Sequence, residues 1–119
     1  MANPFVHIEL QTRNVEQSKK FYTGMFGWKL NEMPEMGYTI IDVGEGTGGG
    51  MMQKPMEGMP DLWLPYILVD DVGAATRKAQ SLGATICKEV TEVPDMGWFS
   101  VLTDPTGAVF GLWQPMAGR

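Results

Sequence analysis

The sequence predicts an α+β fold built from two tandem βαβββ modules whose curved mixed sheets surround a cleft. The succession of one strand, one helix and three strands in the first half of the chain recurs in the second half. Residues 32–37 (EMPEMG) and 92–97 (EVPDMG) match at an offset of 60, and Asn14 and Asp71, each followed by valine, match at an offset of 57. Self-similarity of this kind is typical of a duplicated unit.

The ends of the two halves also agree. Residues 48–55 align with residues 108–115, and both segments close on a proline. At 119 residues the chain is long enough for one moderate core and too short for two independent ones. We therefore expect a single domain over residues 1–119, made of repeats 3–55 and 62–115.

The first module is expected to begin with a strand and a capped helix. Phe5–Thr12 alternates between one apolar face and one mixed face, which is strand periodicity. Asn14 is a favourable N-cap, and Gln17 three residues later completes a pair that is similar to a capping box. Gly24 and Gly27 loosen or end the helix. The remaining strands are predicted at residues 29–32, 38–43 and 50–54.

The second module repeats this order. A strand at residues 64–69 precedes a helix that Asp70 or Asp71 caps and Gly83 ends. Residues 104–107 (DPTG) predict a tight turn before the last strand, because proline presets the second turn position and glycine suits the fourth. The strands after the helix are predicted at residues 84–90, 98–103 and 108–113.

Composition narrows the class of protein. Hydrophobic residues at 44% and charged residues at 19% describe an ordinary globular protein. The net charge of −5 and the scattered Lys and Arg residues argue against a nucleic-acid partner. No apolar run approaches the roughly 20 residues of a membrane span, and no signal pattern is evident, so we expect no membrane partner and a cytoplasmic location.

The chain has one cysteine, Cys87, and one histidine, His7. A single cysteine cannot form an internal disulfide, and no Cys and His cluster exists for structural zinc. We expect Cys87 to be a buried structural thiol in a strand.

Four short motifs identify a family resemblance. They are residues 7–10 (HIEL), 21–22 (FY), 26–28 (FGW) and 104–107 (DPTG). Together with the element order, they resemble the vicinal oxygen chelate superfamily, which includes glyoxalase I, bleomycin-resistance proteins and extradiol dioxygenases. The resemblance covers nearly the whole chain and implies the glyoxalase/bleomycin resistance fold and a homodimer. The fold hosts unrelated chemistries, so it does not fix the function.

The resemblance also points to four positions where metal-containing relatives place their ligands. On the first strands these positions carry His7 and Leu64, and on the closing strands they carry Met51 and Gly111. Only His7 is a suitable donor for a divalent ion, whereas a catalytic zinc takes three protein ligands and water. We therefore expect no metal and no cofactor in this chain.

His7 and Glu9 are the candidate catalytic residues. His7 is a former metal position, a hydrogen-bonding group for a ligand or a proton carrier, unless a neighbouring side chain simply satisfies its imidazole. Glu9 lies two residues along the same strand, so the two side chains share a face about 7 Å apart. Glu9 either pairs with His7 or awaits a cationic or hydrogen-donating ligand.

Strand alternation adds further residues to the expected ligand-binding surface. Aromatic walls with a few polar groups suit a mostly apolar or aromatic ligand. The alternative is that Leu64, Leu68 and Trp113 fill the cleft as core. The complete set of expected ligand-binding residues is His7, Glu9, Gln11, Met51, Gln53, Leu64, Tyr66, Leu68, Gly111 and Trp113.

These observations support three hypotheses. The first is a metal-independent protein of the glyoxalase and bleomycin-resistance type that binds a small apolar or aromatic molecule. A positive charge on this molecule would complement the Glu9 carboxylate. The second is a lyase or isomerase related to glyoxalase I, which either uses His7 and Glu9 as an acid and base pair or is metal-dependent and recruits its metal through unexpected residues. The third is a structural or subunit-interaction module whose cleft is filled by its own side chains.

Overall fold

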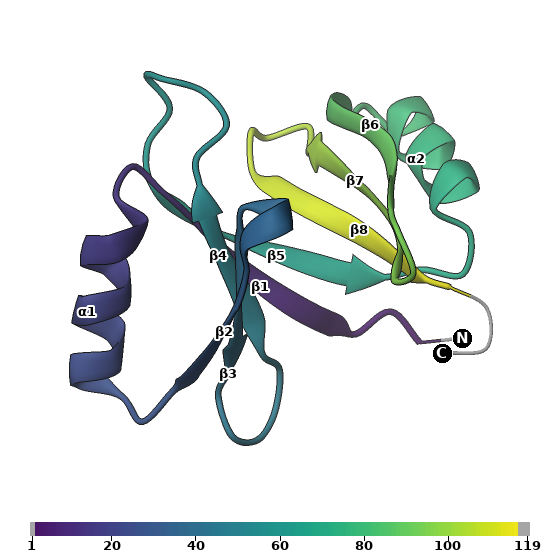
Figure 1. The fold of residues 1–119 in the computed structure, drawn as a ribbon. Coiled ribbons are helices and arrows are strands. Elements are labelled where there is room, and N and C mark those ends of the chain that lie inside the picture. Colours follow the sequence, from purple (N-terminus) through teal and green to yellow (C-terminus); the bar gives the residue numbers. More distant parts are fainter. Residues whose placement is uncertain (1, 117–119) are drawn as a thin grey trace. The chain divides into compact units, whose positions relative to one another are not determined.

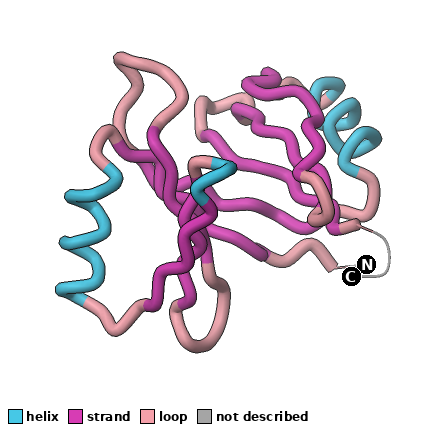
Figure 2. The backbone as a smooth tube through the Cα atoms, viewed as in Figure 1, coloured by secondary structure: helices cyan, strands magenta, loops and turns pink. Residues whose placement is uncertain are grey.

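The computed structural model describes residues 2–116 and shows two βαβββ modules, each with one helix and four strands (Figures 1 and 2). The elements of the first module are β1 (Phe5–Thr12), α1 (Val15–Met25), β2 (Lys29–Met33), the single 3₁₀ turn η1 (Pro34–Met36), β3 (Tyr38–Asp42) and β4 (Gly49–Gln53). Those of the second are β5 (Leu62–Leu68), α2 (Val72–Ser81), β6 (Thr85–Val93), β7 (Gly97–Thr103) and β8 (Val109–Pro115). The predicted α+β class and order of elements are confirmed.

The chain divides into two compact units whose boundary falls inside two strands. One unit is His7–Leu64, and the other joins the residues from Pro65 onward to the segment that precedes His7. That N-terminal segment belongs with the second unit because it bonds to β5. The Leu68 N–H donates to the Pro4 carbonyl at 2.9 Å, and the Asn3 side chain donates to the Leu68 carbonyl at 2.8 Å.

The first module is a mixed sheet with α1 on one face (Figure 1). Its strands run in the order β2-β3-β4-β1, with β1 and β4 parallel and the other pairs antiparallel. Asn14 caps α1, as predicted, by accepting a hydrogen bond from the Gln17 N–H at 3.0 Å. Leu10, Ile41 and Met51 form the buried core between sheet and helix.

The second module repeats this plan. Its strands run β5-β8-β7-β6, with β5 and β8 parallel and the other pairs antiparallel. Asp71, rather than Asp70, caps α2 by accepting from the Ala74 N–H at 3.0 Å. The core cluster of Val72, Leu102 and Leu112 lies beneath the helix.

The predicted turn between β7 and β8 is closed by its own aspartate. The Asp104 carboxylate accepts hydrogen bonds from the Ala108 N–H at 3.0 Å and from the Thr106 N–H and hydroxyl at 2.8 Å each. Donation from Ala108 and Thr106 lowers the pKa of Asp104 below its ordinary value. Gly107 takes the left-handed conformation at φ 103° that the turn requires.

Two details differ from the sequence-based expectations. Cys87 is exposed instead of buried, and its thiol lies 3.0 Å from the Thr103 hydroxyl. Strand β6 extends to Val93, and it accommodates two register irregularities against β7, which shift the alternation that places Cys87.

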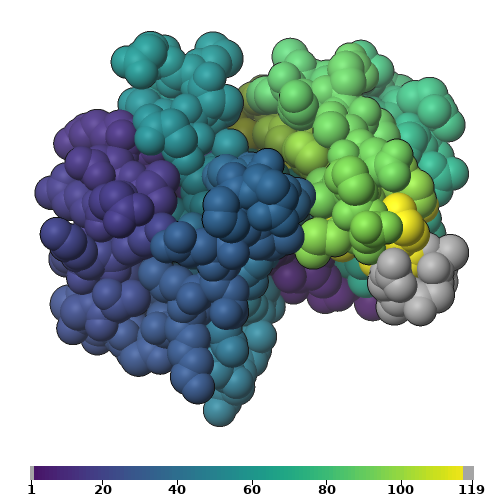
Figure 3. Space-filling model, viewed as in Figure 1, coloured from purple at the N-terminus to yellow at the C-terminus, as the bar shows by residue number. Residues whose placement is uncertain are grey.

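Neither helix in the described range has the length and apolar character needed to cross a membrane. Helix α1 forms part of the outer surface of its module, within the purple group of atoms on the left of Figure 3. It exposes Phe21 and Met25, each 58% accessible, so the apolar side chains of this helix are not all used in the core.

Candidate functional site

The first module carries a row of polar side chains on the sheet face that points away from α1. Successive side chains of a strand point to opposite faces, and Leu10 packs in the core beneath the helix. His7, Glu9 and Gln11 therefore lie together on the other face, as predicted. Glu9 is only 6% exposed and Gln11 only 8%, which is uncommon for polar residues unless their groups are partnered.

A tyrosine from β3 joins these side chains into one hydrogen-bonded network. The Tyr38 hydroxyl lies 2.6 Å from His7 Nε2 and donates to Glu9 Oε1 at 2.9 Å. The Gln11 amide donates to the other carboxylate oxygen, Glu9 Oε2, at 2.8 Å. The His7 and Tyr38 rings are stacked, with centroids 6.1 Å apart and planes 22° apart. The carboxylate thus has a separate neutral donor on each oxygen.

A glycine in β4 makes room for this arrangement. Gly50 pairs with Glu9 on one side and with Ile40 on the other, so it occupies the centre of the same face. A Cβ atom at Gly50 would overlap the Tyr38 hydroxyl and ring carbons. The Tyr38 ring can lie across the sheet toward Glu9 only because residue 50 has no side chain.

The network sets the electrostatics of the face. Burial lowers the pKa of His7 below its ordinary value of 6.5, because removal from water disfavours the charged imidazolium. At neutral pH the face therefore presents a neutral imidazole, next to the Tyr38 hydroxyl and the Glu9 carboxyl group.

The corresponding face of the second module is aromatic. Tyr66 of β5 pairs with Gly111 of β8, and Leu68 pairs with Trp113, so these four predicted residues share the face opposite the core residue Leu112. A Cβ atom at Gly111 would overlap the Tyr66 ring, which also makes an edge contact with Phe99 at a centroid distance of 6.2 Å. The last predicted residue of β5, Leu64, is 1% exposed.

Met51 and Gln53 lie on the other face of the first module. Met51 pairs with Leu10 and is fully buried in the core under α1, and Gln53 pairs with Thr12 on the same side. Met51 was expected on the ligand-binding face because it lies 60 residues before Gly111, the offset that relates the two repeats. The strand register instead makes Gly50 the counterpart of Gly111, and a shift of one residue moves a side chain to the opposite face.

Tyr38 is the site residue that sequence reasoning missed. It begins a short strand and shows no motif, and its partners lie 29 and 31 residues earlier in the chain. The available signal was Gly50, since a glycine inside a strand often marks a close approach by another group.

The sequence profile of the Glyoxalase/Bleomycin resistance protein/Dioxygenase superfamily matches residues 5–112 of this chain. The chain belongs to this superfamily. A solved structure of a superfamily member from Vibrio splendidus 12B01 has the same fold, with a TM-score of 0.68 at 14% identity, covering 97% of this chain and all of that one.

Two relatives are longer than this chain. A Mycobacterium tuberculosis protein named "Putative glyoxylase CFP32" is 39% identical over 114 residues, which cover 90% of this chain and 44% of that protein. The anthracycline biosynthesis protein DnrV of Streptomyces peucetius is 26% identical over 123 residues, which cover 89% of this chain and 45% of that protein. The chain spans less than half the length of these relatives.

The donor set of this superfamily member does not fit a resident divalent ion. Residues 2–116 contain no group of three or more His, Cys, Asp or Glu side chains placed to hold one. His7 and Glu9 are the donors of this type on the polar face, and the Tyr38 hydroxyl lies between them. A catalytic zinc site needs three protein ligands, so no chemistry through a metal is derived for this face.

We expect His7, the single histidine of the chain, to titrate below 6.5 in the folded protein. As pH falls from neutral, the unfolded chain takes up this proton first, so the free energy of unfolding should decrease from about pH 7 until the folded pKa is passed. NMR titration of the imidazole measures the pKa, and urea unfolding measures the slope. His7→Gln should remove that part of the slope. An imidazole pKa at or above 6.5 would contradict the network as described.

We expect Gly50→Ala to displace the Tyr38 ring and to reduce the free energy of unfolding by about 1–3 kcal/mol, the usual cost of overpacking. Chemical denaturation measures the loss. The matched test is the same substitution in a Tyr38→Ala background, where the new methyl group meets no ring and should cost much less. Equal losses in both backgrounds would show that Tyr38 does not lie over Gly50.

Proposed function

We propose that this chain binds a small apolar or aromatic molecule that carries a cationic or hydrogen-donating group, at the polar face of the first module and without a resident metal. One observation carries the proposal. The Glu9 carboxylate is 6% exposed and is positioned on both oxygens by Tyr38 and Gln11. A buried carboxylate costs free energy, so a fold that fixes one in a set orientation favours a recognition role over a purely structural one.

The chemistry of the face defines the ligand class. A buried carboxylate attracts a donor of opposite charge, and charge-assisted hydrogen bonds are stronger than neutral ones. Neutral His7 and the Tyr38 hydroxyl add polar contacts that orient a ligand. The face of the second module is proposed separately as a surface for apolar or aromatic groups, formed by Tyr66, Phe99 and Trp113 together with Leu68 and Gly111. Leu64 remains a proposed ligand-binding residue.

The name of one relative agrees with an aromatic ligand. The Streptomyces peucetius relative is named for anthracycline biosynthesis, and anthracyclines are fused-ring aromatic compounds. We further propose that two copies of this chain associate as a homodimer, as membership of this superfamily implies. Sedimentation velocity tests this, and a monomer at every concentration would exclude it. The cytoplasm remains the expected location.

We expect Glu9→Gln to weaken the binding of cationic aromatic compounds by at least tenfold, since a hydrogen bond to a charged group is worth about 1.5–3 kcal/mol. Calorimetric titration against a panel that includes doxorubicin and neutral aromatic compounds measures this. Glu45→Gln, at an exposed position outside the network, changes the net charge equally and serves as the control. The proposal fails if no member of the panel binds, or if the two variants bind equally well.

A second candidate function is a lyase or isomerase related to glyoxalase I. The continuous contact from His7 through the Tyr38 hydroxyl to Glu9, at 2.6 and 2.9 Å, favours it because such a chain can move a proton. The mycobacterial relative is also named as a glyoxylase.

For this candidate we expect turnover of the methylglyoxal hemithioacetal that falls at least a hundredfold in His7→Ala and is unchanged in Glu45→Gln. The assay follows thioester absorbance with nickel, with zinc and without added metal. Absence of turnover in all three conditions would exclude this candidate and leave the binding function.

A further inference from the structure

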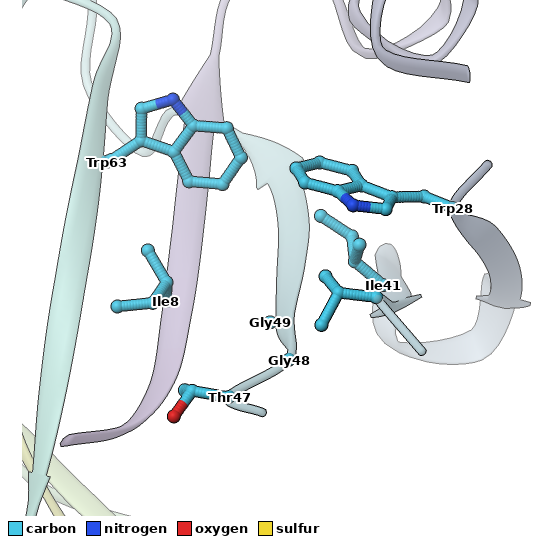
Figure 4. Close-up of a pocket in the computed structure, with 8 residues that line it drawn as sticks. Ile8, Trp28, Ile41, Thr47, Gly48, Gly49 and Trp63 are labelled. Carbon is cyan, nitrogen blue, oxygen red and sulfur yellow. The ribbon is translucent and has the colours of Figure 1, made fainter. Parts of the chain in front are cut away.

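A hollow of about 270 Å³ lies on the opposite face of the first module's sheet from Glu9 (Figure 4). Its apolar lining includes Ile8, Ile41 and Val43, and two tryptophans form its sides. Ile8 alternates with His7 and Glu9 along β1, so this hollow shares no lining residue with the polar network.

The two tryptophans are held at right angles to each other. The Trp28 and Trp63 rings have centroids 6.4 Å apart and planes 86° apart. Tyr22 stacks on Trp28 at 5.7 Å and 11°, and Phe26 contacts it at 5.0 Å, so the orientation of the Trp28 ring is fixed by its neighbours. The two indoles contact each other edge to face, so they form one continuous aromatic wall, and a flat ring in the hollow packs against this wall.

Peptide backbone forms another side of the hollow. Figure 4 shows Gly48 and Gly49 below the two tryptophan rings. The Gly48 carbonyl already accepts a hydrogen bond from the Ile8 N–H at 3.1 Å. A Cβ atom at Gly49 would overlap the Ile8 carbonyl, so the close approach of β1 and β4 requires a glycine here, and residue 49 adds no side chain to the hollow. Glycines allow a bound molecule to approach the backbone closely.

The polarity of the hollow restricts its occupant further. Ionisable side chains do not line it, whereas Trp28 contributes an indole N–H that donates to no residue within the range 2–116. Figure 4 shows this nitrogen on the ring edge nearest Ile41. The hollow is slightly below the usual 300–1,000 Å³ of ligand pockets, so it suits one or two fused rings.

We propose that this hollow is a second binding site, which takes a small planar uncharged aromatic molecule with one hydrogen-bond acceptor. The ring packs against the contacting pair of Trp28 and Trp63, over the Gly48 and Gly49 backbone, and the acceptor receives the Trp28 indole N–H. This site is independent of the function proposed above, because the two lie on opposite faces of one sheet and use different residues.

The test is titration of the full chain with 2-acetylnaphthalene, a neutral two-ring ketone, monitored by ¹H–¹⁵N NMR of the four tryptophan indole groups. Trp→Phe variants assign the signals. We expect saturable shifts at Trp28 and Trp63, with the Trp28 N–H moving downfield, and unchanged signals from Trp98 and Trp113. Trp63→Ala should weaken binding at least tenfold, whereas Met56→Ala, at a position 66% exposed and outside the hollow, should not change it.

Three outcomes would overturn the proposal. The first is the absence of shifts at millimolar probe, and the second is an equal response from all four indoles. The third is a concentration-dependent shift of Trp28 and Trp63 without probe, which would show that a second copy of the chain covers the hollow. Glu9→Gln should leave probe binding intact, so failure of this site and failure of the polar face are distinguishable.

Discussion

The position of the Tyr38 hydroxyl between His7 and Glu9 is the constraint on which the candidate site depends. It requires a glycine at position 50, since any side chain there would displace the ring. It also requires the parallel pairing of β1 with β4, which places Glu9 beside Gly50. In return, the tyrosine gives a buried carboxylate a donor and gives a buried imidazole a neutral partner. Without it, Glu9 would lose the donor to its Oε1 atom and His7 would lose its hydroxyl partner.

The second module uses the same steric device for different chemistry. Tyr66 lies against Gly111 as Tyr38 lies against Gly50, so in each module a tyrosine ring crosses a strand at a glycine. The residue that pairs with this glycine is Glu9 in the first module and Tyr66 itself in the second. Both helix-side faces keep an apolar core, and the modules have diverged mainly on the other face. One module thus supplies a polar face and the other an aromatic one.

The fold could be predicted from sequence because its signals are local and repeated. The Asn14 and Asp71 caps, strand alternation and the duplicated glycine turns each act within a few residues. His7, Glu9 and Gln11 were placed correctly because alternation within one strand fixes their shared face. Met51 was placed on the wrong face because its position depends on the register between two strands. Tyr38 could not be found because its partners are about 30 residues away and are brought close only by the sheet.

The most direct test of the central claim is a crystal structure of the protein grown with an excess of zinc or nickel. The account predicts that the Tyr38 hydroxyl stays within about 3 Å of both His7 Nε2 and Glu9 Oε1, with no ion between them. An ion about 2.0–2.2 Å from His7 Nε2, with Tyr38 displaced and further ligands recruited, would contradict it.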